Sequence, residues 1–242
     1  MSGLVRSGNR GPGEARPAAC IPDFVPPAAG SALISMGRTQ VICTATVEPG
    51  VPRWLAGKGR GWLTAEYGML PASTGQRKPR DATRGRLDGR TVEIQRLIGR
   101  ALRAVVDFDA LGERTVYVDC DVLVADGGTR CASITGAYVA FARAMRVLAE
   151  QELIMRSPLI AGVAAISCGV VGGVALLDLD YSEDSVAEVD ANVVMTDAGG
   201  LVEVQATAER TPLSRAHLDD LLALASLGIE QLHAVQAAAI EL

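Results

Sequence analysis

The stretch Thr115-Val-Tyr-Val-Asp-Cys-Asp-Val-Leu-Val124, followed by Ala125-Asp-Gly-Gly-Thr-Arg130, decides how this chain folds. Its first part is rich in β-branched residues and predicts a strand over 115–124. After Arg130, apolar residues recur at helical spacing and predict a helix over Cys131–Leu153. The sequence therefore predicts a strand that turns directly into a helix.

The junction between this strand and this helix has the residues of an anion-binding site. Gly127 and Gly128 let the backbone turn tightly and point successive N–H groups outward at the positive end of the helix dipole. Thr129 adds a hydroxyl, and Arg130 adds a forked, permanently charged donor. The alternative is an ordinary helix start with a surface arginine, and the short motif alone does not decide between the two.

The order of the remaining elements is typical of an α+β domain. Residues 1–30 are rich in Gly, Pro and Ala, and we expect this N-terminal segment to be poorly ordered. We expect one domain over 31–242, because no internal repeat or linker interrupts it. The other expected elements are a hairpin of 31–36 and 39–47, a strand over 62–70, a helix capped by Thr91 and running to about Val106, strands over 161–169, 173–181, 188–196 and 201–207, and a final helix capped by Ser214.

The composition is that of a globular protein with a large aliphatic core. Of 242 residues, 49% are hydrophobic and only 4% are aromatic. No stretch has the roughly 18 uninterrupted apolar residues of a membrane span, and the N-terminus lacks the apolar part of a secretory signal. The five cysteines form no Cys-x-x-Cys pair, so neither a disulfide framework nor a zinc knuckle is indicated. We expect a cytoplasmic protein with reduced cysteines.

Histidine is too scarce to carry the chemistry. The chain has two, His217 and His233, and both fall in the final expected helix. A Ser-His-Asp triad or a histidine-rich metal site is therefore not supported. Any reaction must depend on carboxylates, arginines and a hard metal ion.

Charge is distributed unevenly along the chain. The net charge is −5, yet residues 51–103 carry twelve Lys and Arg against four Asp and Glu, a local +8 that leaves −13 for the remainder. Within that segment, 71–86 has no apolar periodicity, and we expect it to be exposed. Such asymmetry favours a basic surface for a polyanion, and the alternative is a solvated basic helix face.

Six acidic residues crowd into 178–190. Like charges so close together repel one another unless a cation or basic groups compensate them. Asp184 and Asp190 can converge on one sheet edge, and two carboxylates with water and substrate oxygens commonly hold Mg²⁺. The alternative is a solvated acidic loop. Combined with the anion-binding junction and the basic segment, the pair predicts phosphoryl chemistry on a nucleic acid.

Six longer strings give this hypothesis a more specific form. They are Gly61-Trp-Leu-Thr-Ala-Glu-Tyr-Gly-Met-Leu-Pro71, Gly89-Arg-Thr-Val-Glu-Ile-Gln-Arg-Leu-Ile-Gly-Arg100, Asp119-Cys-Asp-Val122, Ala125-Asp-Gly-Gly-Thr-Arg130, Ala132-Ser-Ile-Thr-Gly136 and Glu183-Asp-Ser-Val-Ala-Glu-Val-Asp190. In this order the chain, from about Gly30 to Glu230, resembles the bacterial ribonuclease PH family of phosphate-dependent 3′→5′ exoribonucleases.

The resemblance implies a fold and an activity. The fold would be a single ribonuclease PH-like domain of the ribosomal protein S5 domain 2-like type, with mixed β-sheet layers packed with helices. The enzyme would act as a tRNA nucleotidyltransferase that trims single-stranded 3′ ends of tRNA precursors. It would consume inorganic phosphate, release nucleoside diphosphates and assemble as a homo-hexamer, a trimer of dimers, without a membrane partner.

The resemblance also assigns roles to residues of this chain. The attacking phosphate would be bound by Arg90, Gly128, Thr129 and Arg130. The catalytic residues Asp184 and Asp190 would hold Mg²⁺, with Mn²⁺ as an alternative metal, and Arg77 and Arg80 would contact the RNA backbone.

The chain departs from the family pattern at Ala72, Val124, Cys131 and Ala191, and none of these is an expected phosphate or metal ligand.

Two rival functions stay open at this point. One is a non-catalytic RNA-binding ring subunit of an exosome-like assembly, and the other is a nuclease that uses water in place of phosphate.

Overall fold

The computed structural model describes residues 6–80, 83, 85–209 and 212–242. Its strands are β1 (Ala18–Pro22), β2 (Gly30–Met36), β3 (Thr39–Pro49), β4 (Trp62–Met69), β5 (Arg114–Val124), β6 (Val163–Val171), β7 (Val174–Leu177), β8 (Val189–Thr196) and β9 (Leu201–Ala208). Its helices are η1 (Ser7–Asn9), α2 (Gly89–Arg103), α3 (Phe108–Leu111), α4 (Thr129–Glu150), α5 (Tyr181–Asp184) and α6 (Arg215–Glu241).

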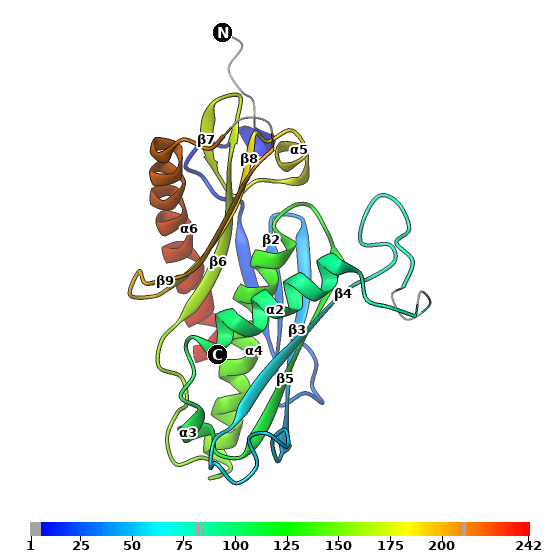
Figure 1. The fold of residues 1–242 in the computed structure, drawn as a ribbon, viewed down its shortest axis with the longest axis vertical. Coiled ribbons are helices and arrows are strands. Elements are labelled where there is room, and N and C mark those ends of the chain that lie inside the picture. The colour runs from blue at the N-terminus through cyan, green and yellow to red at the C-terminus, as the bar shows by residue number, and fades with distance from the viewer. Residues whose placement is uncertain (1–5, 81–82, 84, 210–211) are drawn as a thin grey trace.

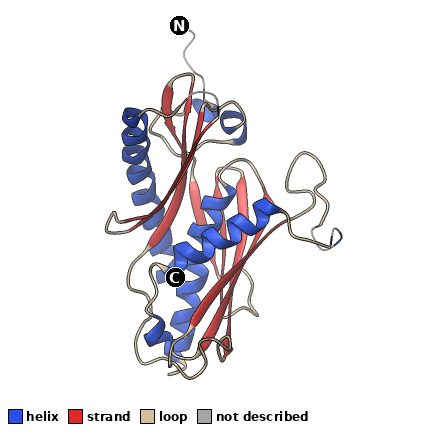
Figure 2. Ribbon diagram, viewed as in Figure 1, coloured by secondary structure: helices blue, strands red, loops and turns tan. Residues whose placement is uncertain are grey.

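The strands form two sheets with helices packed on them (Figures 1 and 2). The first sheet has the order β1-β2-β3-β5-β4 and is antiparallel except for the parallel pair β4 and β5. The second has the order β7-β6-β8-β9 and is antiparallel throughout. The chain thus has the α+β fold with a mixed sheet that the sequence predicts.

Helix α4 holds the two sheets together. It contacts β2 and β3 of the first sheet and β6 of the second. The approach to β2 and β3 is so close that a Cβ at Gly136 would lie 2.6 Å from the Ile34 side chain and 2.9 Å from Cys43 Sγ. One hydrophobic cluster therefore runs through both sheets. Strand β6 contacts both α4 and α6, and all of its residues are buried.

Most expected elements are confirmed, and two details are corrected. Asp88, not Thr91, caps α2, because the Asp88 side chain accepts the backbone N–H of Arg90. The expected strand over 173–181 ends at Leu177, and the short helix α5 follows. Ser214 caps α6 as predicted, accepting the backbone N–H of His217 at 3.1 Å.

The N-terminal segment differs most from expectation. Residues 1–5 lie outside the described residues, but 6–30 are part of the fold. Strand β1 pairs antiparallel with β2, and the side chains of Arg6, Arg10 and Arg16 are buried. Distant carboxylates, which composition does not reveal, hold this segment in place.

Helix α6 is long and apolar enough, by length and composition, to cross a membrane. In the structure its apolar side faces β6, β7 and β8, with Leu221, Ala225, Ile229 and Leu232 buried. Packing of this kind is the ordinary role of a core helix in a globular domain.

Candidate active site

The turn from β5 into α4 is a backbone nest at a helix N-terminus. Gly127 and Gly128 both have positive φ angles, 81° and 69°, and Gly128 is the N-cap residue of α4. A Cβ at Gly127 would lie 2.6 Å from the carbonyl oxygen of Leu179, so the turn fits tightly against the segment that precedes α5. Successive N–H groups at such a turn bind anions.

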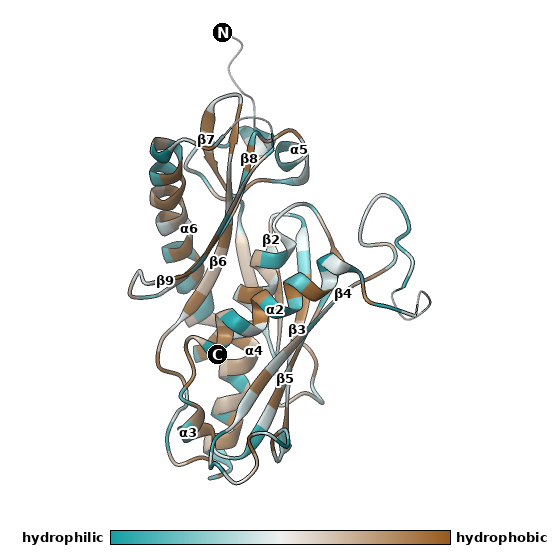
Figure 3. Cartoon of the chain, viewed as in Figure 1, coloured by the Kyte–Doolittle hydropathy of each residue, from teal (hydrophilic) through white to brown (hydrophobic). Residues whose placement is uncertain are grey.

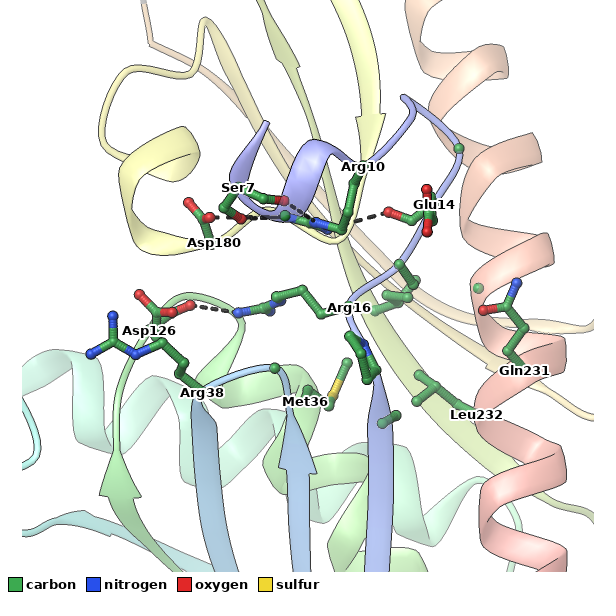
Figure 4. A pocket seen from close by; sticks show the side chains of 18 of the residues that line it. Ser7, Arg10, Glu14, Arg16, Met36, Arg38, Asp126, Asp180, Gln231 and Leu232 are labelled. Carbon is green, nitrogen blue, oxygen red and sulfur yellow. Dashed lines mark hydrogen bonds and ion pairs between the residues drawn. The ribbon is translucent and has the colours of Figure 1, made fainter. Parts of the chain in front are cut away.

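A buried arginine from the N-terminal segment supports this turn. Arg16 Nη1 donates to the carbonyl oxygen of Asp126 at 2.6 Å (Figure 4). Its Nη2 donates to the carbonyl oxygen of Gly127 at 3.4 Å. Thr39 Oγ1 donates to the same Gly127 oxygen at 2.7 Å and accepts the Asp126 N–H at 3.0 Å. Arg16 and Thr39 thereby satisfy the carbonyl groups of Asp126 and Gly127 and hold the turn in place.

The same arginine reaches the acidic segment. Arg16 Nη2 lies 2.7 Å from Asp178 Oδ1, and its Nε donates to Asp178 Oδ2 at 2.8 Å. Both side chains are almost fully buried. Burial acts to lower the pKa of Arg16, but the hydrogen bond and the charge of Asp178 outweigh it and raise that pKa. One guanidinium thus joins the nest to the strand end that leads into α5.

Two further arginines fix α5 itself. Arg6 Nε lies 2.7 Å from Glu183 Oε1, and Arg10 Nη2 lies 3.2 Å from Glu183 Oε2. Glu183 also completes a capping box with Asp180 at the start of α5. Asp184 is the next residue, so these buried ion pairs set the position of an expected metal ligand. Sequence reasoning missed all three arginines, and their spacing in a Gly- and Pro-rich segment gave no sign of burial.

The nest and the acidic segment meet at one small cavity of about 50 Å³. Its lining combines cationic, hydroxyl, amide and carboxylate groups from both halves of the chain. The lining residues are Arg90, Gly128, Thr129, Arg130, Ser167, Leu179, Asp184, Asp190 and Asn192. The structure therefore brings together all six residues expected to bind phosphate or metal.

Neighbouring side chains hold the phosphate-facing groups in position. Arg130 Nη1 donates to Gln205 Oε1 at 2.6 Å and lies 3.6 Å from Glu93 Oε1. The hydroxyl of Tyr67 donates to Thr129 Oγ1 at 3.0 Å. Burial raises the pKa of Tyr67 despite these neighbours, so its phenol stays protonated and able to donate.

The pKa values of the Asp184 and Asp190 carboxyl groups are both raised. Burial is the main cause at both, and at Asp190 the charge of Asp184 adds to it. Arg90 and Arg130 act in the opposite direction at both carboxylates without cancelling the effect. Each carboxylate is therefore costly to ionise where it stands, and a bound cation would relieve that cost.

This donor set fits Mg²⁺. Among the described residues there is no group of three or more His, Cys, Asp or Glu side chains that could hold a metal. Mg²⁺ is usually held by one or two carboxylates with waters and substrate phosphates, not by a full protein cage. Asn192 adds an amide close to the pair, with Nδ2 3.5 Å from both Asp190 carboxylate oxygens.

Cys131 departs from the family pattern without entering the cavity. Its Sγ lies 3.2 Å from Asn192 Oδ1, and burial raises the pKa of its thiol. The thiol therefore stays neutral and orients the amide that faces Asp190.

The basic segment after β4 lies beside a second, wider cavity. That cavity measures about 690 Å³ and shares Arg90, Gly128, Thr129 and Asp184 with the small one, while Thr74, Gly75 and Gln76 line its outer side. Figure 3 shows the segment as largely hydrophilic. Arg77 and Arg80 are exposed and line neither cavity, so the structure places them near the site but not in it.

Family models match both halves of the chain. Residues 14–146 match domain 1 of the 3′ exoribonuclease family, and residues 162–227 match domain 2. The chain belongs to the 3′ exoribonuclease family. The two matched segments correspond to the two sheets, so the cavity between the nest and the acidic segment joins the family's two domains.

Three solved structures are similar in fold to this family member. Rrp46 of rice (Oryza sativa) is 18% identical with a TM-score of 0.78, and the match covers 97% of this chain and 100% of that one. A chain of the Archaeoglobus fulgidus exosome, solved with RNA bound to the active site, is 25% identical with a TM-score of 0.79 over 95% and 91% of the two chains. A chain of an archaeal exosome core is 23% identical with a TM-score of 0.74 over 96% and 91%.

Proposed function

We propose that this protein is a phosphorolytic 3′→5′ exoribonuclease of the ribonuclease PH type. It trims the 3′ ends of RNA with inorganic phosphate and releases nucleoside diphosphates. The observation that carries the proposal is the small cavity in which Arg90, Arg130 and the nest face Asp184 and Asp190. A site with two guanidiniums and no histidine suits the positioning of phosphoryl groups.

One set of residues binds the inorganic phosphate, and the other acts on the last phosphodiester of the RNA. Arg90, Arg130 and the N–H groups at Gly128 bind and orient inorganic phosphate for in-line attack on the last phosphodiester. Asp184 and Asp190 would hold Mg²⁺, which supplies positive charge against the charge that develops in the transition state. The bond from phosphorus to the 3′ oxygen of the penultimate nucleotide breaks as the bond to the attacking phosphate forms.

The wider cavity gives the RNA a route to this site. It shares Arg90, Gly128, Thr129 and Asp184 with the small cavity and adjoins the basic segment that carries Arg77 and Arg80. Arginine side chains bind the phosphate backbone of single-stranded RNA without recognising its bases.

We propose that the substrates are single-stranded 3′ ends of tRNA precursors and that the protein acts on them in the cytoplasm. The likeness to exosome chains supports a ring, which we propose is a homo-hexamer.

Product analysis tests the reaction. The protein is incubated with a 3′-extended RNA and Mg²⁺, with and without inorganic phosphate, and the released nucleotides are separated by chromatography. We expect nucleoside diphosphates, formed only when phosphate is present. Nucleoside monophosphates formed without phosphate would assign the site to hydrolysis instead.

Substitutions locate the reaction in the cavity. Arg130→Ala and Asp184→Asn should each lower the phosphate-dependent rate by about 10²–10³-fold, since each removes one electrostatic stabiliser. Arg100→Ala is the matched control, because Arg100 lies on the same helix as Arg90 but pairs with Glu203 at the surface. Full activity in Asp184→Asn would remove the metal assignment.

The likeness to chains of archaeal exosomes supports one second candidate, a non-catalytic RNA-binding ring subunit of an exosome-like assembly. The cavity argues against it, since the arginines and the aspartates are all present. RNA binding with no nucleotide release under any phosphate concentration would favour this candidate.

A further inference from the structure

Ser167 is a buried serine whose hydroxyl has no partner. It lies in the middle of β6 and is 4% exposed. Its carbonyl oxygen accepts the Asp178 N–H at 2.8 Å, and Ser167 lies opposite Asn192 in the pairing of β6 with β8. Its Oγ makes no hydrogen bond, a condition shared, within the described parts of the chain, only by Ser73 Oγ and His233 Nε2 among buried side-chain polar atoms.

The Ser167 side chain faces the small cavity. It is one of two hydroxyl residues in the lining, and the other, Thr129, already accepts a hydrogen bond from Tyr67. A Cβ built on Gly128 would lie 3.5 Å from Ser167 Oγ, so the hydroxyl sits beneath the N-cap of α4. It therefore reaches the same space as the nest and the two arginines.

A hydroxyl in this position is unfavourable in the free protein. A buried polar group without a partner loses its hydrogen bonds to water and gains none in return. The rest of β6 is almost entirely apolar, and alanine at 167 would avoid the cost. Serine at this position is explained if a ligand in the cavity supplies the missing partner.

The cavity indicates which ligand this is. Its volume of about 50 Å³ exceeds the roughly 10–15 Å³ that one water needs and suits a small tetrahedral ion. Arg90 and Arg130 make one side of it cationic, and the hydroxyl lies next to the nest on that side. We propose that Ser167 Oγ donates a hydrogen bond to an oxygen of the attacking inorganic phosphate. This inference rests on the proposed function and adds a binding residue from the second sheet to a phosphate site otherwise built from residues between Arg90 and Arg130.

Calorimetric titration of inorganic phosphate into the full-length protein in EDTA tests this role without requiring activity. Ser167→Ala should weaken phosphate binding by about 10-fold, the effect of one lost hydrogen bond to a charged group. Ser73→Ala is the matched control, because it also removes a buried unpartnered hydroxyl but at a residue that lines neither cavity at the site. It should bind phosphate as the wild type does.

Two further readings separate a binding role from a structural one. Without phosphate, Ser167→Ala should melt at the wild-type temperature or above it, since it removes an unsatisfied group. In phosphorolysis it should raise the KM for phosphate by about the same factor as the Kd, with the KM for RNA unchanged.

The outcomes distinguish this inference from the proposed function. Wild-type phosphate affinity in Ser167→Ala, or a lower melting temperature without phosphate, would overturn the role of Ser167 and leave the proposed function in place. Failure of the wild-type protein itself to bind phosphate would overturn both.

Discussion

Two arginine-containing regions of this protein differ in burial. Arg6, Arg10 and Arg16, near the N-terminus, are buried against carboxylates and backbone carbonyls. Arg77 and Arg80, in the segment after β4, are exposed. The side chain is the same, so the difference lies in what each guanidinium meets. Where the fold supplies a fixed carboxylate, arginine becomes a structural link, and elsewhere it stays available for a polyanion.

The buried region does more than close the fold. Arg16 contacts the turn at 126–127 and Asp178, and Arg6 and Arg10 contact Glu183, the neighbour of Asp184. Both walls of the small cavity are therefore anchored to one N-terminal segment. Arg77 and Arg80 are exposed and make no ion pair with any of the described residues, so they remain available for the proposed contact with RNA. Substitutions in the two regions should accordingly change different properties.

The largest effect on stability is expected at Arg16. Arg16→Ala leaves the buried carboxylate of Asp178 without its main partner, so we expect the free energy of unfolding to fall by about 3–5 kcal/mol. Urea unfolding measures this loss. Arg38→Ala is the matched control, since Arg16 and Arg38 line one pocket beside Asp126 but Arg38 is exposed (Figure 4). Equal stability of the two variants would erase the distinction between the regions.

A smaller effect is expected from the coupling between Arg6 and Glu183. A double-mutant cycle with Arg6→Met and Glu183→Gln should give a coupling free energy of about 1–3 kcal/mol, because the pair is buried and joined by two hydrogen bonds. Additive single effects would show that the pair does not hold α5. The same variants should lose activity, since Asp184 follows Glu183 directly.

Asp180 gives the buried region a dependence on pH. Burial acts to raise its pKa, but hydrogen bonds from Ser182, Ser7 and the backbone N–H of Glu183 outweigh burial and lower it to about 2. The ionised form therefore stabilises the fold by about 2 kcal/mol. This contribution is complete above the usual value of 3.8 and is lost as the pH falls from about 4 to about 2. Acid unfolding of Asp180→Asn should lack this component, and an acid transition identical to the wild type would contradict the assignment.

The smallest effect on stability is expected in the exposed region. Arg77→Ala should leave the unfolding free energy within about 0.5 kcal/mol of the wild type. It should weaken RNA binding uniformly across sequences and reduce the slope of log affinity against log salt by about one. Fluorescence anisotropy over a salt series measures both. A salt slope that does not change would remove Arg77 from the RNA path.

The sequence predicted the turn that lines the small cavity better than it predicted the segment that supports this turn. The turn at 126–130 was predictable because β-branched residues, two glycines and helical spacing are all local signals. The role of the N-terminal segment was not, because Arg16 meets Asp178 across 162 positions of the chain. The unpartnered hydroxyl of Ser167 was not predictable for a related reason. A side chain without a hydrogen-bond partner can be recognised only when the positions of all its neighbours are known.

In the proposed reaction, phosphate bound between Arg90, Arg130 and the nest attacks the RNA. An isotope experiment follows this phosphate directly: inorganic phosphate labelled with phosphorus-32 is supplied with an unlabelled 3′-extended RNA, and the label is located after the reaction. We expect the label in the released nucleoside diphosphates, and we expect it to be absent from them in Arg130→Ala. Unlabelled nucleoside monophosphates, with all of the label still in inorganic phosphate, would contradict it.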